Sequence, residues 1–583
     1  MRDGEDDFRV RPGKGRDGGN GSGRKAKTLV AQVRRAAAKA GYTRRAPGVR
    51  RGGTGQHGRG RRAALSARRS ATGRRVVIKA RVVRHTGARF RAAPLARHVA
   101  YLERDGVTRD GRDASMFDAR SDAADGDAFA ERCEDDRHHF RFIVSPEDAG
   151  EMADLRTFTR ELMSDMARDL DTTLDWVGVD HWNTDNPHIH ILVRGVADDG
   201  KDLVVDRDYI REGMRARAEG RVTLELGPRT EHDIQAALTR EVDAERWTSL
   251  DQKLQRLADE NMGIIDLRPD PSGAHPDQRQ LMVGRAMKLE RLGLAVKIEP
   301  ACWTLKPDLE TTLRDISIRG DIIKTMHRAM AATGRSADPA GFALHGDEVS
   351  DPVIGRLVER GLHDELSGTA YAVIDGADGR THHLRFNDLD MTGDAPPGAV
   401  VELRSWDDAK GQARHSLATR SDLPLEAQIT ARGATWLDRQ LVARDPVATG
   451  AGFGAEIRSA MAARADHLVA DGQARRQGQR LKVSRDLLET LKRRDLDDAV
   501  QQIADRTGLP HRPSASGDYV TGAYRERVTL ASGRFAMIDD GLGFQLVPWR
   551  PALDPHLGSA VTGTMTPGGG VNWTFGRQRG LGL

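Results

Sequence analysis

Residues 175–195 constrain the fold of this chain more than any other segment. Two apolar, β-branched runs, DWVGVDHW and HIHILVRG, flank a short stretch, NTDNP, in which Asn, Asp and Pro favour a turn. Such runs pair as an antiparallel hairpin. Two earlier strand patterns, RRVVIKARVVRH and HHFRFIVSP, alternate with helical patterns over 94–105 and 146–170. The sequence therefore predicts an α+β domain over about 74–225, with a central antiparallel sheet and helices on one face.

Three histidines lie in the predicted hairpin. Side chains alternate along a strand, so His188 and His190 project from the same face while the isoleucines beside them point to the core. If residues 182–187 form the loop, His181 faces His188 across the two strands. Three imidazole nitrogens on a rigid sheet make an open metal site that leaves coordination positions for substrate oxygens. Asp185 is placed to hold a ring N–H behind such a site.

The alternative is that these histidines are structural or merely solvated. A His-x-His pair is common in a chain with 19 histidines, and only the third histidine on a paired strand makes the pattern specific. The spacing does not identify the metal, because imidazole ligands suit zinc, manganese or nickel while a phosphate substrate brings magnesium. A divalent metal ion is the predicted cofactor, with magnesium or manganese favoured and zinc or nickel as the alternatives.

Positive charge is concentrated at the start of the chain. Residues 1–75 hold 22 Lys and Arg against 5 Asp and Glu, a net charge of +17, while the whole chain has a net charge of only +5. No acidic residue lies between Asp17 and Glu103. A basic arm of this kind, rich in Gly and poor in apolar residues, is expected to be disordered over 1–73 and to bind nucleic acid. A solvated tail or a misassigned start codon is the alternative.

Tyr101 is the candidate nucleophile for phosphodiester chemistry. In the helix predicted over 94–105 it lies about 120° from the centre of the apolar stripe, so it is poorly placed as a core residue. Arg97 and Arg104 lie within one helical turn of it, and their guanidinium groups favour a phosphate or a phenolate at that position. A surface tyrosine on an amphipathic helix is the alternative.

The rest of the chain predicts further domains without a catalytic pattern. A winged-helix-like domain is expected over 226–335, because a Thr-x-x-Asp cap opens its helices and a helix ending in RLG precedes two short strands. Such domains bind duplex DNA or serve as protein–protein modules. Residues 336–445 predict a small β-barrel or sheet with a helix, and residues 446–583 predict helices and a β-hairpin with DDG at its turn. No long period of self-similarity is evident, which argues against a solenoid or a propeller.

Cysteine content and hydropathy predict a cytoplasmic protein. The two cysteines, Cys133 and Cys302, are too few for a disulfide framework. No run of about 18 apolar residues is present, so membrane insertion is not expected.

Three segments resemble, in this order, the motifs of conjugative relaxases, the mobilisation nucleases of the HUH endonuclease superfamily. They are YLERDG, FRFIVSPED and DHWNTDNPHIHILVRG. The likeness is to the type that nicks plasmid transfer origins and Ti-plasmid borders, although about a hundred residues precede the tyrosine here. Two later segments, GATWLDRQL and GRFAMIDDGLGFQLVPWRP, resemble a long C-terminal region of unknown function found in one relaxase subgroup.

The resemblance implies an HUH-type catalytic domain over 74–225 and a role for each matching residue. Tyr101 matches the nucleophile, Ser145 the second-motif serine near the DNA backbone, and Asp185 the acidic residue before the metal ligands. The implied metal ligands are His181, His188 and His190, and Arg97, Arg104 and Ser145 are the candidate DNA contacts.

The activity implied by the resemblance is a site- and strand-specific nick at a transfer origin, made by tyrosine transesterification with a 5′-phosphotyrosyl intermediate. The implied partners are single-stranded DNA at the origin, a type IV coupling protein and accessory origin-binding proteins, with the protein exported alongside the DNA. Three alternatives stay open: an HUH replication initiator or transposase, a hydrolytic metallonuclease, and a noncatalytic DNA-binding regulator with structural histidines.

Overall fold

A computed structural model describes most of the chain beyond residue 57. Its described residues form two compact units, the first ending at Arg319 and also including Glu365–Ser367, the second made of Gly320–Asp364 and the residues from Gly368 onward. None of the described helices is long and apolar enough to cross a membrane. The described residues are 58–67, 70, 72–85, 95–103, 109, 114–182, 187–269, 276–335, 338–346, 349, 352–409, 411–478 and 480–575.

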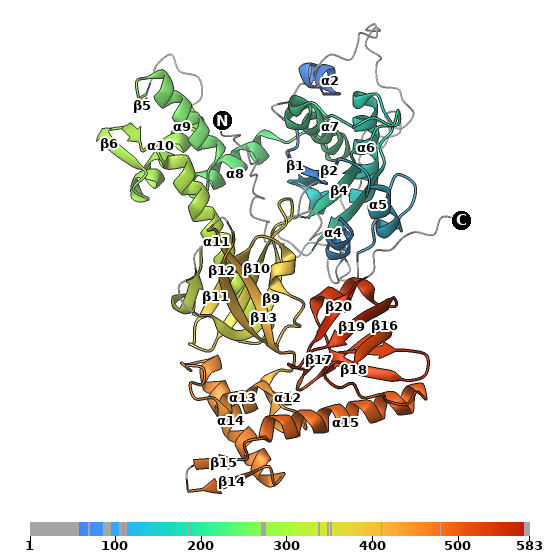
Figure 1. Cartoon of the computed structure of the whole chain (residues 1–583). Helices are drawn as coiled ribbons and strands as arrows, with labels where there is room; N and C mark the ends of the chain where they lie inside the picture. The colour runs from blue at the N-terminus through green and yellow to red at the C-terminus, as the bar shows by residue number, and fades with distance from the viewer. Residues whose placement is uncertain are drawn as a thin grey trace. The chain divides into compact units, whose positions relative to one another are not determined.

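The first unit contains a four-stranded antiparallel sheet with the order β1-β2-β4-β3, and Figure 1 labels β1, β2 and β4 of this sheet. This sheet confirms the α+β prediction and the four predicted strands. Along β4, the isoleucines that alternate with histidines are fully buried, as the period of two requires. The strands are β1 (Val76–Arg84), β2 (His138–Pro146), β3 (Trp176–His181) and β4 (His188–Arg194).

Helices cover both faces of this sheet, whereas the sequence predicted helices on one face. Helices α6 (Leu155–Leu170) and α7 (Met214–Leu226) bury their apolar faces against one side in the larger core cluster. Helices α4 (Leu95–Leu102) and α5 (Gly126–Arg132) form a second cluster with side chains of β3 and β4 that point the other way. The prediction was wrong here because alternate residues of β3 and β4 are apolar on both faces, so each face needs a cover.

Ordered structure begins before residue 74, where the predicted basic arm ends. Residues 1–57 lie outside the described residues, but Arg59 pairs with Val205 in an isolated β-bridge and helix α2 follows (Arg61–Ser66). The Arg59 guanidinium also donates to the backbone carbonyl of Asp171, 3.0 Å away. Glycine at position 58 allows the backbone to come this close to residues 205 and 206, since a Cβ at Gly58 would lie 2.5 Å from the backbone nitrogen of Asp206. The arm was therefore predicted to extend too far.

Four helices and a three-stranded sheet, ordered β5-β7-β6, follow in the first unit and reach the start of the second. The predicted Thr-x-x-Asp cap is present at Thr230, whose hydroxyl accepts from the backbone of Asp233 while the Asp233 carboxylate accepts from Thr230. The predicted pair of strands after Arg291 is present as well. These elements are α8 (Glu231–Val242), α9 (Ser249–Glu260), β5 (Ile264–Asp266), α10 (Pro276–Arg291), β6 (Ala295–Glu299), β7 (Cys302–Leu305) and α11 (Leu309–Ala332).

The second unit holds a six-stranded sheet, a five-stranded sheet and a two-stranded hairpin. The six-stranded sheet has the order β13-β12-β9-β10-β11-β8, and among the described residues no pairing joins its two end strands. Over the described residues it is therefore an open sheet, which is the second of the two predicted alternatives and not a barrel. Its strands are β8 (Phe342–Leu344), β9 (Ile354–Asp364), β10 (Thr369–Gly376), β11 (Thr381–Phe386), β12 (Val400–Asp407) and β13 (Ala413–Ser421).

The remaining elements of the second unit confirm the predicted C-terminal helices and the hairpin turning at DDG, which joins β17 to β18. The helices are α12 (Leu425–Thr430), α13 (Trp436–Val442), α14 (Phe453–Ala470) and α15 (Leu487–Thr507). The strands are β14 (Ala474–Gln477), β15 (Arg480–Val483), β16 (Tyr519–Leu530), β17 (Gly533–Asp539), β18 (Phe544–Pro548), β19 (Ala560–Met565) and β20 (Val571–Thr574). Short helical segments lie at Ala149–Glu151, Tyr209–Gly213, Pro339–Gly341, Leu389–Thr392 and Pro551–His556.

Candidate metal centre

The β3–β4 hairpin brings the three predicted histidines together. His181 pairs directly with His188 across the two strands, which confirms the register assumed from the sequence. His190 lies two residues further along the same face, and its ring centroid is 4.5 Å from that of His181. Asp185 lies in the turn, outside the described residues. The strand period alone therefore aims three imidazoles at one point.

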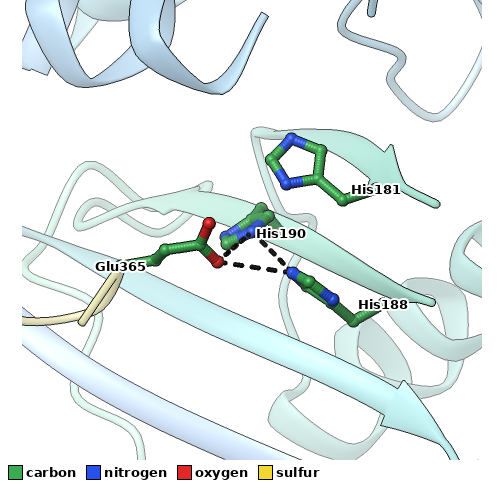
Figure 2. A group of neighbouring side chains, drawn as sticks. All are labelled: His181, His188, His190 and Glu365. Atoms are coloured by element: carbon green, nitrogen blue, oxygen red, sulfur yellow. Dashed lines mark hydrogen bonds and ion pairs between the residues drawn. The ribbon is translucent and has the colours of Figure 1, made fainter. Parts of the chain in front are cut away.

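A carboxylate completes the cluster (Figure 2). Glu365 belongs to the first compact unit, and the ligand atoms of His181, His188, His190 and Glu365 all lie within 4.8 Å of one another. Glu365 Oε2 is 2.8 Å from His190 Nε2 and 3.3 Å from His188 Nε2, and these two nitrogens are 3.1 Å apart. Sequence reasoning missed Glu365, because it is 177 residues from His188 and no local pattern marks it.

The electrostatics of the cluster favour an ionised carboxylate. Burial opposes ionisation of Glu365, but the imidazoles of His190 and His188 hold the pKa of this carboxyl well below its usual range. Three imidazole nitrogens and a carboxylate oxygen are lone-pair donors that suit zinc, manganese or nickel. The cluster can therefore hold a divalent metal ion.

The orientation of His181 fits a metal ligand. Its Nε2 lies 2.9 Å from the carbonyl oxygen of Leu102, to which it donates, so Nδ1 carries the lone pair of the neutral ring. Metal-binding histidines characteristically donate their second ring nitrogen to a carbonyl or a carboxylate, which fixes the tautomer. This bond also joins the cluster to helix α4, whose last residue is Leu102.

Helix α4 places Tyr101 next to this contact. Its stripe residues Leu95, Val99 and Leu102 are buried, as predicted, while Tyr101 is half-buried. Residues three apart share a helix face, so Tyr101 neighbours His98. The description includes neither the Arg97 side chain nor any part of Arg104.

His98 shows that this face of α4 adjoins the cluster. Burial and the positive charge of Arg141 hold the pKa of His98 well below its usual range, and His190 and Glu365 also act on it electrostatically. His98 was not singled out from the sequence. Its spacing of three residues from Tyr101 was the available signal.

Ser145 lies at the end of β2, beside the hairpin. Its side chain is buried, and its hydroxyl donates to the carbonyl oxygen of Pro187 over 3.4 Å, directly before His188. In the structure this serine therefore holds the start of β4 in place.

Cations follow the same face of the sheet. Lys79 lies opposite Ile143, which lies opposite His190, and Arg81 lies opposite Arg141 one step along. Directly paired residues project from the same side of a sheet, so Lys79, Arg81 and Arg141 share the face of the metal ligands. The alternating cations of VIKARVVR are the signal that sequence reasoning passed over.

Arg141 is also oriented by a histidine pair. Its Nε donates to His139 Nε2 at 2.9 Å, which makes that nitrogen the acceptor and leaves Nδ1 to donate to His85 Nε2 at 2.6 Å. Burial, with the charge of Arg141, holds the pKa of His139 well below its usual range, consistent with this neutral tautomer. These two hydrogen bonds therefore fix the orientation of the Arg141 guanidinium.

Comparison with known protein families matched one family, described as a protein of unknown function, DUF3363. The matches span residues 282–419 and 404–582, which together cover more than half of the chain. They begin after the sheet that carries the histidines and include Glu365. No curated protein and no solved structure matched the chain. The chain belongs to the DUF3363 family.

Proposed function

We propose that this protein is a metal-dependent DNA relaxase that nicks a single strand through Tyr101 at the transfer origin of a plasmid or other mobile element, and that it remains bound to the 5′ end for conjugative transfer. One observation carries the proposal: the His181 ring at the metal cluster is hydrogen-bonded to Leu102, the residue next to Tyr101. The nucleophile and the metal ligands that the sequence suggested separately thus belong to adjoining elements. The resemblance to relaxases supplies the reaction.

In the proposed reaction, the Tyr101 oxygen forms a bond to phosphorus as the bond from phosphorus to the 3′ oxygen breaks. The phenolic proton passes to solvent, and the leaving oxygen takes up a proton to become a 3′-hydroxyl. A divalent cation, when bound by His181, His188 and His190, supplies positive charge at the nonbridging oxygens. The product is a phosphotyrosine ester, which the 3′-hydroxyl can later attack to reseal the strand.

The protein's own cations supply the rest of the binding energy for DNA. Lys79 and Arg81 lie partly exposed along the face that carries the metal ligands, where they would contact phosphates of an unpaired strand, whereas Arg141 on the same face is buried. Single-stranded DNA is the proposed substrate, as the resemblance to relaxases implies.

The direct test is a covalent adduct. The full chain is incubated with manganese and single-stranded 30-mers that tile the DNA flanking its gene and carry a 3′ dye, and the products are separated on a denaturing gel. A dye-labelled protein band is expected, and it should disappear in Tyr101→Phe and in His190→Ala. Tyr519→Phe is the matched control, since Tyr519 is an exposed tyrosine of β16 in the second unit.

Two outcomes would overturn the proposal. A band that persists in Tyr101→Phe would assign the nucleophile elsewhere. Metal-dependent cleavage that never yields a protein-bound fragment would indicate a hydrolytic metallonuclease. A replication initiator or transposase would give the same adduct, and a gene for a type IV coupling protein beside this one would favour the relaxase.

The fourth ligand favours a second candidate function, a structural metal site in a noncatalytic DNA-binding protein. Four protein ligands close a tetrahedral site, as in structural zinc centres. In that case zinc would copurify at one equivalent, its removal would unfold the first unit, and Glu365→Gln would weaken folding. A relaxase site should instead tolerate Glu365→Gln without loss of fold, because three histidine ligands remain.

A further inference from the structure

Two parts of the chain are built around the same buried ion pair. In the first unit, Arg285 is fully buried and its Nε and Nη2 donate to the two carboxylate oxygens of Asp251, at 2.8 and 2.9 Å. In the second unit, Arg464 makes the same two bonds to Asp438, also at 2.8 and 2.9 Å, and is fully buried as well. In both, the remaining guanidinium hydrogens donate to backbone carbonyls.

The surroundings of the two pairs also correspond. Asp251 closes a capping box with Thr248, and Asp438 closes one with Thr435. Each arginine lies in a helix that ends two residues before a glycine with a φ of 70°, Gly293 or Gly472, and a hairpin follows each.

The sequences share the pattern that these contacts require. T-x-L-D-x-x-L occurs at 248–254 and 435–441, and R-A-x-x-L-x-x-x-G-x-A occurs at 285–295 and 464–474. The chain therefore contains two copies of one helix–helix–hairpin module. The two copies give no regular period, because the spacing between the two patterns differs, with 34 residues from Asp251 to Arg285 and 26 from Asp438 to Arg464.

The two hairpins differ in chemistry. The β6 strand of the first copy exposes Val296 and Ile298 and balances Lys297 with Glu299. The second copy reads ARRQGQRLKVSR from 474 to 485, with five cations and no acidic residue. The two copies thus share a scaffold, and only the second carries a strongly basic hairpin.

The register of this hairpin separates its two faces. Arg476 pairs with Leu481, Leu481 packs on the module's core, and Arg476 forms an ion pair with Asp466. Arg475 pairs with Lys482 on the other face, which is exposed. Two like charges directly opposite destabilise a hairpin, so this face favours an anionic ligand.

Arg480 extends that face. It lies two residues before Lys482 on β15 and is exposed, so it projects from the same side. Arg475, Arg480 and Lys482 form the outer face of the hairpin. Strand geometry spaces Arg480 and Lys482 by about 7 Å, close to the spacing of successive phosphates along a nucleic acid strand.

We propose that the outer face of the β14–β15 hairpin binds the phosphate backbone of double-stranded DNA, independently of base sequence. This inference rests on the hairpin and not on the proposed nicking activity. A two-stranded ribbon fits the wide groove of a duplex, with its cations directed at the flanking phosphates. The hairpin would therefore hold intact duplex, whereas the proposed nicking site takes a single strand.

The test measures the salt dependence of binding. The full chain is titrated against a dye-labelled, random-sequence 30-base-pair duplex at 50 to 300 mM salt, and anisotropy gives the binding constant. The slope of the logarithm of the association constant against the logarithm of the salt concentration is negative. In the triple variant Arg475→Gln/Arg480→Gln/Lys482→Gln its magnitude should fall by up to about 2.7, since each lost phosphate contact removes about 0.9.

The matched control removes three cations from the first module, as Lys297→Gln/Lys306→Gln/Arg291→Gln. Its slope should stay within experimental error of the unmodified chain. An equal change in both variants would reduce the effect to net charge and overturn the proposal, as would no change in either. If the first variant instead loses binding to vesicles containing phosphatidylserine and keeps its duplex affinity, the partner is a membrane surface and the proposal fails. Unchanged circular dichroism checks that both variants fold.

Discussion

The protein buries polar side chains in two different ways. Around Arg464, all five guanidinium hydrogens have acceptors, because Asp438 takes two and the carbonyls of Ile429, Ala431 and Gly433 take the others. Every donor has a matching acceptor inside the protein. This ion pair therefore has no capacity left for a ligand, and its role is to fix the path of the surrounding backbone.

The histidine and glutamate cluster has the opposite composition. His188 Nε2, His190 Nε2 and Glu365 Oε2 lie within 3.3 Å of one another, where the carboxylate only accepts and each ring nitrogen accepts or donates according to its tautomer. Converging acceptors stabilise one another only through a proton or a cation between them. A cluster in which every donor has an acceptor, which we call balanced, stabilises the fold. A cluster with more lone pairs than protons instead marks a site for a ligand.

The largest predicted effect concerns the balanced clusters. Arg464→Met leaves Asp438 buried without its counter-charge and should lower the free energy of unfolding by about 3–5 kcal/mol. Arg285→Met should have the same effect through Asp251, because the two modules share the contact. Urea denaturation followed by circular dichroism measures both. Arg476→Met, which removes an exposed ion pair, is the control and should cost under about 1 kcal/mol.

At the histidine cluster, losing a side chain should reduce stability only when metal is bound. His190→Ala removes one metal ligand but leaves Glu365 its contact with His188, so the metal-free protein should lose little stability. With manganese at 100 times its dissociation constant, the unmodified chain should gain about 2.7 kcal/mol, and the variant should lose this gain. Thermal melting with and without manganese measures the difference. A large loss of stability without metal would place this cluster with the structural ones.

A third buried group sharpens the comparison through pH. Burial, with His363 and Arg385 nearby, lowers the pKa of His383 to about 3. The unfolded chain binds this proton near pH 6.5 and the folded chain only near pH 3. The neutral His383 therefore contributes its full stability above pH 6.5, and this contribution is lost as the pH falls from 6.5 to 3. The steepest fall is about 1.4 kcal/mol per pH unit.

His383→Phe should remove this acid dependence. Phenylalanine keeps the stacking on Tyr371, whose ring lies 5.4 Å from that of His383, and it cannot titrate. Denaturation midpoints at pH 4.5 and pH 7 should then differ less than in the unmodified chain. An unchanged difference would assign the acid sensitivity to other carboxylates and histidines.

The smallest expected effect tests the equivalence of the two modules. Thr248→Ala and Thr435→Ala each remove the hydroxyl of a capping box and should each cost about 1 kcal/mol. Differential scanning calorimetry of the two single variants compares them. If the losses of unfolding free energy differ by more than a factor of two, the two capping boxes contribute differently to stability despite their shared sequence pattern.

The sequence predicted well wherever the physics is local. The period of two in HIHILVRG and the turn formers before it fixed the hairpin, and the pairing of His181 with His188 followed. The stripe of α4 predicted which of its residues are buried. The Thr-x-x-Asp pattern predicted a capping box because its two hydrogen bonds involve residues only three apart.

The sequence predicted poorly wherever distant residues meet. Glu365 lies far from the histidines along the chain, and no periodicity links it to them. The partners of Arg285 and Arg464 are 34 and 26 residues away, so these two arginines look like ordinary surface cations in the sequence. Helices on the second face of the sheet were missed because the cover of a face depends on the whole topology.

The sequence by itself determined the strand period, the turn, the caps and the imidazoles that share one face, because each depends on neighbours within a few residues. Only the tertiary structure decided that a carboxylate joins those imidazoles, that the carbonyl beside Tyr101 orients one of them, and that two modules close on the same buried ion pair. Those contacts join residues that are far apart in the sequence, and interactions between distant residues leave no local sequence pattern.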